Sequence, residues 1–181
     1  GMVTTELVED YSATGFVDDI DTNLNGVWRT IKATLPYLRE SKGHVSIIAS
    51  LASFIHMPEI SAYSASKAGV LALANSLRLE LDGSGVTVGT IHPSFFESAL
   101  GDALTSSPLL SRASGNFTGL FAPVKREDVV AAIVKNIERR SRVAVLPRAF
   151  SALSLAPGLG QRVIEPYLSH NLRRGTEKLE R

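Results

Sequence analysis

The stretch SLASFIHMPEISAYSASK, Ser50–Lys67, decides how this chain is organised. It joins the predicted end of a strand to a helix, with Ser50 thirteen residues before Tyr63 and Lys67 four residues after it. Residues four apart on a helix lie one turn apart on the same face, so the Tyr63 phenol and the Lys67 ammonium can point into one cleft. With the Ser50 hydroxyl arriving from the strand, the stretch predicts a proton-transfer site.

Helices and strands alternate on both sides of this stretch. Apolar residues at helical spacing, glycine-containing stops and short β-rich runs mark the elements. We expect, with Ser12 as the first N-cap, helices over 12–39, 62–81 and 127–139 and strands over 44–49, 86–91 and 143–146. The alternation predicts an α/β fold in which helices cover a parallel sheet.

Three strands make a small sheet, and the strand over 44–49 is apolar enough to be paired on both sides. With no strand predicted before it, this strand leaves an apolar edge. We therefore expect a sheet that is truncated at its N-terminal side. One partial domain is expected over 1–147, with the aperiodic residues 94–123 as a substrate lid or a set of short helices, and 148–181 as a C-terminal extension with a frayed charged end.

Composition excludes several classes of function. The chain has 181 residues, is 44% hydrophobic and 20% charged, and carries a net charge of +1, which gives no support to nucleic-acid binding. It has no cysteine, no apolar run long enough to span a membrane and no signal-peptide pattern, so we expect a cytoplasmic protein. A basic membrane-surface helix over 150–174 is an alternative, weakened by Pro157 and Gly158 in its apolar stripe.

The chain resembles the short-chain dehydrogenase/reductase family. A Tyr-x-x-x-Lys pair is a weak signal by itself, and the resemblance rests on its combination with other motifs over about residues 1–147. These are Ser50 with Tyr63 and Lys67, Asn23 followed by Gly26 and Val27, the helix end Lys32–Leu38, and the strand Val86–Pro93 that leads to a turn. The resemblance implies a Rossmann-like, doubly wound parallel sheet.

The first part of the family pattern is missing. Members begin with a strand, a glycine-rich turn and a helix that cradle the cofactor pyrophosphate, and no such turn precedes a helix here. Counting back from Asn23 puts Gly1 at the last glycine of the family's Asn-Asn-Ala-Gly motif, although a tag glycine would explain it equally. The sequence thus resembles the C-terminal two-thirds of a member.

The resemblance implies hydride transfer between NAD or NADP and an alcohol or carbonyl carbon. Tyr63 is the expected general acid and base, and Lys67 is expected to lower the pKa of its phenol and to hold the nicotinamide ribose. Ser50 would hydrogen-bond the substrate oxygen, with Ser53 as the alternative. Asn23 would order a water that relays protons; the alternative for this role is the nearby Asn25.

Weaker cofactor contacts lie after the second predicted strand. Pro93 and Ser94 align with the family's Pro-Gly turn, whose backbone passes the nicotinamide, and Ser94 departs from glycine. Ser98 stands where members often have a threonine that contacts the carboxamide. The four histidines lack metal-ligand spacing and are expected to be surface or packing residues rather than part of a metal site: His44, His56, His92 and His170.

Substrate and assembly follow from the same reading. Apolar side chains in the lid predict a small apolar alcohol or carbonyl substrate: Leu104, Leu109, Leu110, Phe117, Leu120 and Phe121. Helices 12–39 and 62–81 are those that the family commonly packs together, which implies a homodimer or homotetramer. The alternative function, favoured by the missing glycine-rich turn, is a catalytically incompetent fragment or oligomerisation module that does not bind the dinucleotide.

Overall fold

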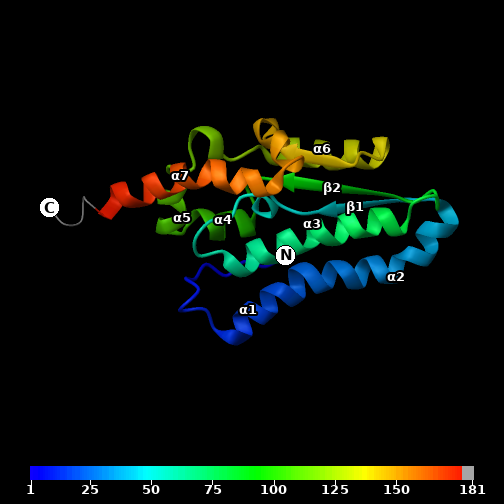
Figure 1. The fold of residues 1–181 in the computed structure, drawn as a ribbon, viewed down its shortest axis with the longest axis horizontal. Helices are drawn as coiled ribbons and strands as arrows, with labels where there is room; N and C mark the ends of the chain where they lie inside the picture. The colour runs from blue at the N-terminus through cyan, green and yellow to red at the C-terminus, as the bar shows by residue number, and fades with distance from the viewer. Residues whose placement is uncertain (177–181) are drawn as a thin grey trace.

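The computed structural model describes residues 1–176 and arranges them in three layers (Figure 1). A parallel sheet in the order β1-β2-β3 forms the middle layer, from β1 (His44–Ile48), β2 (Thr87–Pro93) and β3 (Val143–Leu146). Helix α6 (Arg126–Arg139) covers one face, and α2 (Gly26–Ser41) and α3 (Ser61–Glu80) cover the other. The α/β fold with a helix-covered parallel sheet is confirmed.

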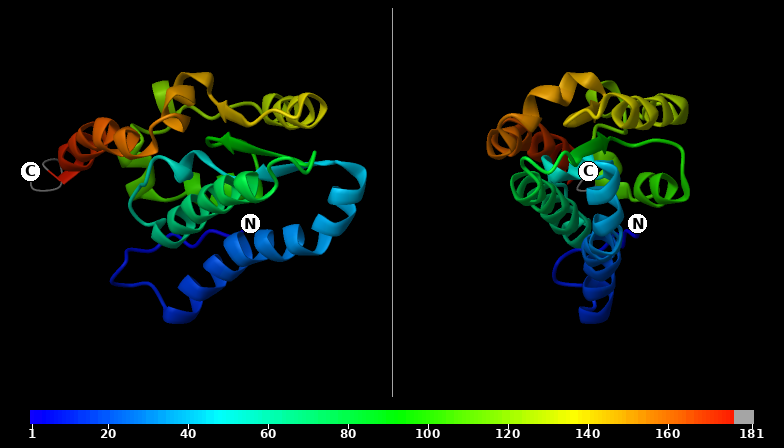
Figure 2. Two further views of the ribbon diagram at one scale, coloured as in Figure 1. Left: turned by 45° about the vertical axis from the view of Figure 1, so that its right-hand side comes forward. Right: turned by 90° about the vertical axis from the view of Figure 1, so that its right-hand side faces the viewer.

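The predicted helix over 12–39 is one continuous run with an irregular middle. It begins at α1 (Ala13–Ile20), where the Ser12 hydroxyl accepts a hydrogen bond from the Gly15 N–H at 3.0 Å, and it ends with α2. Between them lies a π-helical turn, η1 (Asp21–Asn25). Pro36 lies inside α2 without ending it. Figure 2 shows this run and α6 on opposite sides of the sheet.

The sheet packs against both helical layers. On one side Val70 and Ala74 of α3 are fully buried against the strands. Full burial of a side chain such as that of Val70 stabilises the fold by about 1.5–3 kcal/mol. On the other side the Asn136 amide of α6 accepts from the Ser46 hydroxyl at 2.8 Å and from His44 Nε2 at 3.1 Å. A Cβ atom at Gly89 would collide with Asn136, so glycine lets α6 approach β2 closely.

Strand β1 lies at an edge, as expected. Among residues 1–176 it pairs only with β2, and Ile48 at its end is 41% exposed. Strand β2 extends two residues beyond the predicted end, because its last residues pair with β3 up to Pro93 and Leu146.

Residues 94–123 are filled by short helices: α4 (Ala99–Thr105), α5 (Pro108–Ala113) and the 3-10 turn η3 (Gly119–Phe121). Leu110 and Phe121 are fully buried in the core below them. The segment is therefore a packed cap over one end of the sheet.

The C-terminal extension differs from the prediction. After the 3-10 segment η4 (Arg148–Ser154), helix α7 (Pro157–Thr176) runs without interruption and packs against α5. Pro157 stands in its first turn, where the missing N–H costs nothing, so the Pro-Gly pair begins the helix and does not break it. The expected fraying is wrong for Arg173 and Arg174, which are helical; residues 177–181 lie outside the described part. No helix in the described part is long and apolar enough to cross a membrane.

Candidate active site

Ser50, Tyr63 and Lys67 meet at one cavity of about 300 Å³ at the carboxyl end of β1 and β2. Ser50 follows β1 and caps the 3-10 turn η2 (Leu51–Ser53), its hydroxyl accepting a hydrogen bond from the Ala52 N–H at 3.1 Å. Tyr63 and Lys67 lie in the first two turns of α3 and are 6% and 8% exposed. The spacing in the sequence therefore places the three side chains on one lining.

The Tyr63 phenol is held in a protonated form. Burial raises its pKa above the ordinary value, while a hydrogen bond with the Ser50 hydroxyl acts in the opposite direction. Burial is the larger of the two causes, so the net shift of this pKa is upward, and the lowering by Lys67 stays a prediction. The Lys67 ammonium lies 5.5 Å from the centroid of the Tyr63 ring.

Lys67 is anchored to the strand end. Its ammonium donates a hydrogen bond to the Ile48 carbonyl oxygen at 3.3 Å, and its own burial lowers its pKa from 10.5 to about 8. An ammonium has three N–H donors. The bond to Ile48 uses one of them, so the other two can serve a ligand in the cavity.

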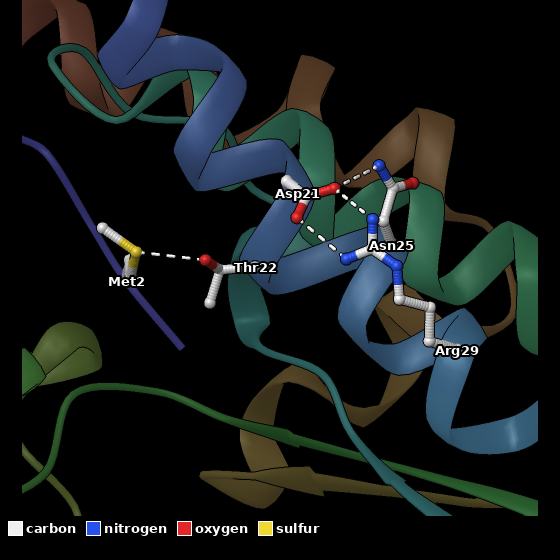
Figure 3. Close-up of polar contacts among 5 residues, drawn as sticks. All are labelled: Met2, Asp21, Thr22, Asn25 and Arg29. Atoms are coloured by element: carbon white, nitrogen blue, oxygen red, sulfur yellow. Dashed lines mark hydrogen bonds and ion pairs between the residues drawn. The ribbon is translucent and has the colours of Figure 1, made fainter. Parts of the chain in front are cut away.

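Asn23 is buried in the π-helical turn and holds the first residues of the chain. Its Oδ1 accepts from the Met2 N–H at 2.9 Å, and its Nδ2 donates to the Met2 carbonyl at 2.8 Å. The neighbouring Thr22 hydroxyl also contacts the Met2 sulfur at 3.1 Å (Figure 3). Gly1, which lines the cavity, lies so close to Asn23 that a Cβ would be 2.8 Å from its Oδ1. Each amide atom keeps capacity for one more hydrogen bond, as an ordered water would need.

The two alternative residues point elsewhere. The Ser53 hydroxyl is buried and donates to the Lys67 carbonyl at 2.9 Å. The Asn25 amide donates to Asp21 at 3.0 Å, beside the Asp21–Arg29 ion pair in Figure 3. Of the residues described, Ser50 lines the cavity and Ser53 does not, so the geometry favours Ser50. Asn23 and Asn25 both lie outside the lining, and Asn23 is the one that lies against the lining residue Gly1.

Pro93, Ser94 and Ser98 also line the cavity, but their polar groups differ. The Ser98 hydroxyl caps α4, accepting from the Gly101 N–H at 2.9 Å and donating to the Phe96 carbonyl at 3.3 Å. The Ser94 hydroxyl is buried, and among the described residues it has no hydrogen-bond partner. Of these two serines, Ser94 is therefore the one whose hydroxyl is free to donate to a ligand.

Most of the remaining lining is apolar. Two of the six predicted lid residues, Leu104 and Phe121, contribute to it, whereas Leu110 is buried beneath and Leu120 is 43% exposed. Further apolar walls come from the loop before α3 and from the residues after β2: Leu51, Ile55, Met57, Ile60, Phe95, Phe96 and Leu100.

His92 is the packing residue that the sequence predicts, and it also contacts Ser50, which the sequence did not indicate. It is fully buried, its Nδ1 hydrogen-bonds the Ser50 carbonyl at 3.1 Å, and its ring lies 4.4 Å from that of Phe54. Burial lowers its pKa from 6.5 to about 4, so it is neutral at pH 7. Its place at the end of a strand adjacent to the one that leads to Ser50 was the available signal. Within residues 1–176, no three His, Asp or Glu side chains gather as a metal site would require.

Helix α7 braces the loop between Ser50 and Tyr63. The His56 N–H donates to Gln161 Oε1 at 2.8 Å, and Gln161 Nε2 donates to the His56 carbonyl at 3.4 Å. The Gln161 side chain of the C-terminal extension thus pairs with both backbone groups of His56, in the loop that lines the cavity.

Comparisons with known proteins agree on one family. A family model described as short chain dehydrogenase matches residues 1–108. The chain is 31% identical over 170 residues to 11-beta-hydroxysteroid dehydrogenase 1A of Arabidopsis thaliana, covering 88% of this chain and 46% of that protein. It is 35% identical over 109 residues to the L-fucose dehydrogenase of Mus musculus, covering 60% and 40%. The chain spans less than half the length of these curated relatives.

Solved structures show the same fold. A gluconate 5-dehydrogenase from Burkholderia cenocepacia in complex with NADP and tartrate superposes with a TM-score of 0.72 at 16% identity, covering 84% of this chain and 62% of that one. A 4-hydroxyisoleucine dehydrogenase complexed with NADH gives 0.69 at 24% identity, covering 80% and 63%. The predicted Rossmann-like fold class is confirmed.

Proposed function

This chain belongs to the short-chain dehydrogenase/reductase family, and we propose that it carries the proton-transfer part of an NAD(P)-dependent oxidoreductase acting on an alcohol/carbonyl pair. The observation that carries the proposal is the convergence of Ser50, Tyr63 and Lys67 on the lining of one largely apolar cavity. The named relatives are dehydrogenases, and the solved structures contain NADP or NADH, which supports the same chemistry here.

In the reductive direction Tyr63 gives its phenolic proton to the substrate oxygen, and Ser50 donates a hydrogen bond to that oxygen as negative charge develops on it. Burial keeps the phenol protonated at neutral pH, which suits the acid role. A reduced nicotinamide, when bound, would supply the hydride that the carbonyl carbon receives. Lys67 holds its position through the Ile48 carbonyl and presents its remaining N–H groups to the ribose side of the cavity.

The lining fits the nicotinamide end of the cofactor. The unpartnered Ser94 hydroxyl is a donor for a carboxamide, and the backbone at Pro93 borders the same space. Tyr63, Lys67, Pro93, Ser94 and Ser98 would hold the nicotinamide and its ribose; Ser98 does so less directly because α4 uses its hydroxyl.

The substrate would be small and apolar. Leu104 and Phe121 from the cap and Met57 from the loop before α3 face the cavity, and few of its other lining groups are polar. A cavity of about 300 Å³ is at the lower end of the range for small-molecule sites, so the substrate shares it with the nicotinamide only if its carbon skeleton is short.

A second candidate function is a catalytically incompetent fragment or oligomerisation module. It is favoured by the open edge of β1 and by the share of the relatives that the chain spans. The 181-residue chain should be titrated with NADH and with NADPH while cofactor fluorescence is followed. Saturable binding supports the enzyme, and absence of binding at millimolar cofactor supports the fragment.

Turnover gives the sharper test. Tyr63→Phe should lower kcat by about 10²–10⁴-fold with little change in cofactor affinity, because it removes only the transferable proton. Tyr37→Phe is the matched control, since Tyr37 is 72% exposed on α2. If Tyr63→Phe kept more than about a tenth of the kcat, Tyr63 would not be the proton donor.

Assembly as a homodimer or homotetramer would use the helical layer formed by 12–39 and 62–81. Large apolar side chains stand exposed along it, among them Val17 at 62%, Trp28 at 46% and Leu79 at 81%. Light scattering after size exclusion tests this: a monomer at all concentrations would contradict the assembly but not the chemistry of the cavity.

A further inference from the structure

We propose that His92 is a positioning residue that fixes the backbone of Ser50, and with it the place of the Ser50 hydroxyl on the cavity lining beside Tyr63. The role assigned to Ser50 rests on the proposed function. The anchoring itself rests on the local geometry at the end of the sheet.

Ser50 stands where the backbone pairing of β1 with β2 stops. The last hydrogen bond of the ladder runs from the Ala49 N–H to the Ile91 carbonyl at 2.8 Å. The next carbonyl, that of Ser50, accepts the His92 Nδ1–H at 3.1 Å and the Ser53 N–H at 3.0 Å. The His92 side chain thus replaces the backbone donor that β2 no longer provides. The Ser50 carbonyl is held by His92 from the strand side and by the Ser53 N–H from the turn η2.

The His92 ring is itself fixed. It is fully buried against the ring of Phe54, with 35° between the two planes. Because its partner is a carbonyl oxygen, Nδ1 carries the proton and Nε2 is the unprotonated nitrogen. Among the residues described, Nε2 has no hydrogen-bond partner, so the bond to Ser50 is the polar contact that orients the ring.

Packing alone does not account for a histidine here. A buried acceptor without a partner destabilises the fold, a cost that a leucine of similar size would avoid. The donor at Nδ1 is what leucine lacks, and it acts on the backbone of Ser50. The Lys67 ammonium, in contrast, is anchored at Ile48 and does not depend on His92.

The test compares His92→Leu, which removes the donor, with His92→Asn, whose amide nitrogen can lie where Nδ1 lies. Amide hydrogen exchange by NMR in the 181-residue chain needs neither cofactor nor turnover. The Ser53 N–H is bound to the Ser50 carbonyl and the Ala52 N–H to its hydroxyl, so both report on Ser50. In His92→Leu both should exchange about tenfold faster, and in His92→Asn they should regain protection.

Amides of α6 are the internal reference. Faster exchange throughout the chain, unchanged exchange at Ala52 and Ser53, or equal behaviour of the two variants would overturn the anchoring. Where turnover is measurable, His92→Leu should lower kcat rather than raise the cofactor KM, and it should cost nothing further in a Ser50→Ala background. Full additivity of the two substitutions would refute the action through Ser50. A chain that binds no dinucleotide removes the proposed function and leaves the exchange result as it stands.

Discussion

Replacing Lys67 with methionine should make the protein more stable at neutral pH. Lys67 is 8% exposed, and burial lowers the pKa of its ammonium from 10.5 to about 8. At pH 7 the folded protein therefore holds a positive charge in surroundings that favour the neutral amine. The step from 10.5 to about 8 corresponds to roughly 3 kcal/mol. The hydrogen bond to the Ile48 carbonyl offsets about 1–1.5 kcal/mol of this cost. The free energy of unfolding of Lys67→Met should therefore exceed that of the parent by about 1–2 kcal/mol.

The pH dependence of the free energy of unfolding tests independently whether the Lys67 charge destabilises the fold. Between pH 8 and 10.5 the unfolded chain binds the Lys67 proton more tightly than the folded chain, so the free energy of unfolding of the parent protein rises with pH in that window. The methionine variant lacks this rise. The difference between the two proteins should therefore be largest at pH 7 and should shrink by pH 10.

Urea unfolding followed by circular dichroism at several pH values measures both effects. Lys135→Met on the exposed face of α6 is the matched control and should change stability by less than about 0.5 kcal/mol. A Lys67→Met variant that is less stable than the parent at pH 7, or that differs from it by the same amount at every pH, would refute the reasoning.

Two further predictions concern stability. Burial lowers the pKa of His92 from 6.5 to about 4, so the unfolded state binds its proton more tightly than the folded state. The free energy of unfolding should therefore fall by up to about 3 kcal/mol as the pH drops from 6.5 to 4. In urea titrations at several pH values, His92→Leu should flatten this pH dependence, and an unchanged slope would contradict the prediction. Asn136→Leu leaves Ser46, His44 and the Ser141 carbonyl without their shared partner and should destabilise the fold by about 2–3 kcal/mol, read from the midpoint of thermal unfolding, whereas a shift within error would show that water replaces the amide.

The spacing of Ser50, Tyr63 and Lys67 predicted that these side chains share a lining because that spacing is a property of one strand end and one helix. The helices and strands were predictable for the same local reason. The Tyr63 pKa was not, because it depends on burial by residues far along the chain, such as Leu104 and Phe121 in the cap.

Other errors arose where a local rule has two outcomes. A proline disfavours the interior of a helix but suits its first turn. The sequence around Pro157 does not distinguish the two cases, and only the structure shows that α7 begins at Pro157. Likewise, His92 fitted the pattern of a packing residue, and only the end of the β1–β2 ladder showed that it has a specific partner.

The pairing of Gln161 with His56 has a consequence for how the protein is made. It joins positions 105 residues apart, so during synthesis the loop that walls the cavity leaves the ribosome long before the helix that braces it. Contacts between residues so distant in sequence form only after the entropy of closing a long loop has been overcome. We therefore expect the reactive pocket to be among the last parts of the molecule to take its final shape, after the sheet and its two helical layers are already in place.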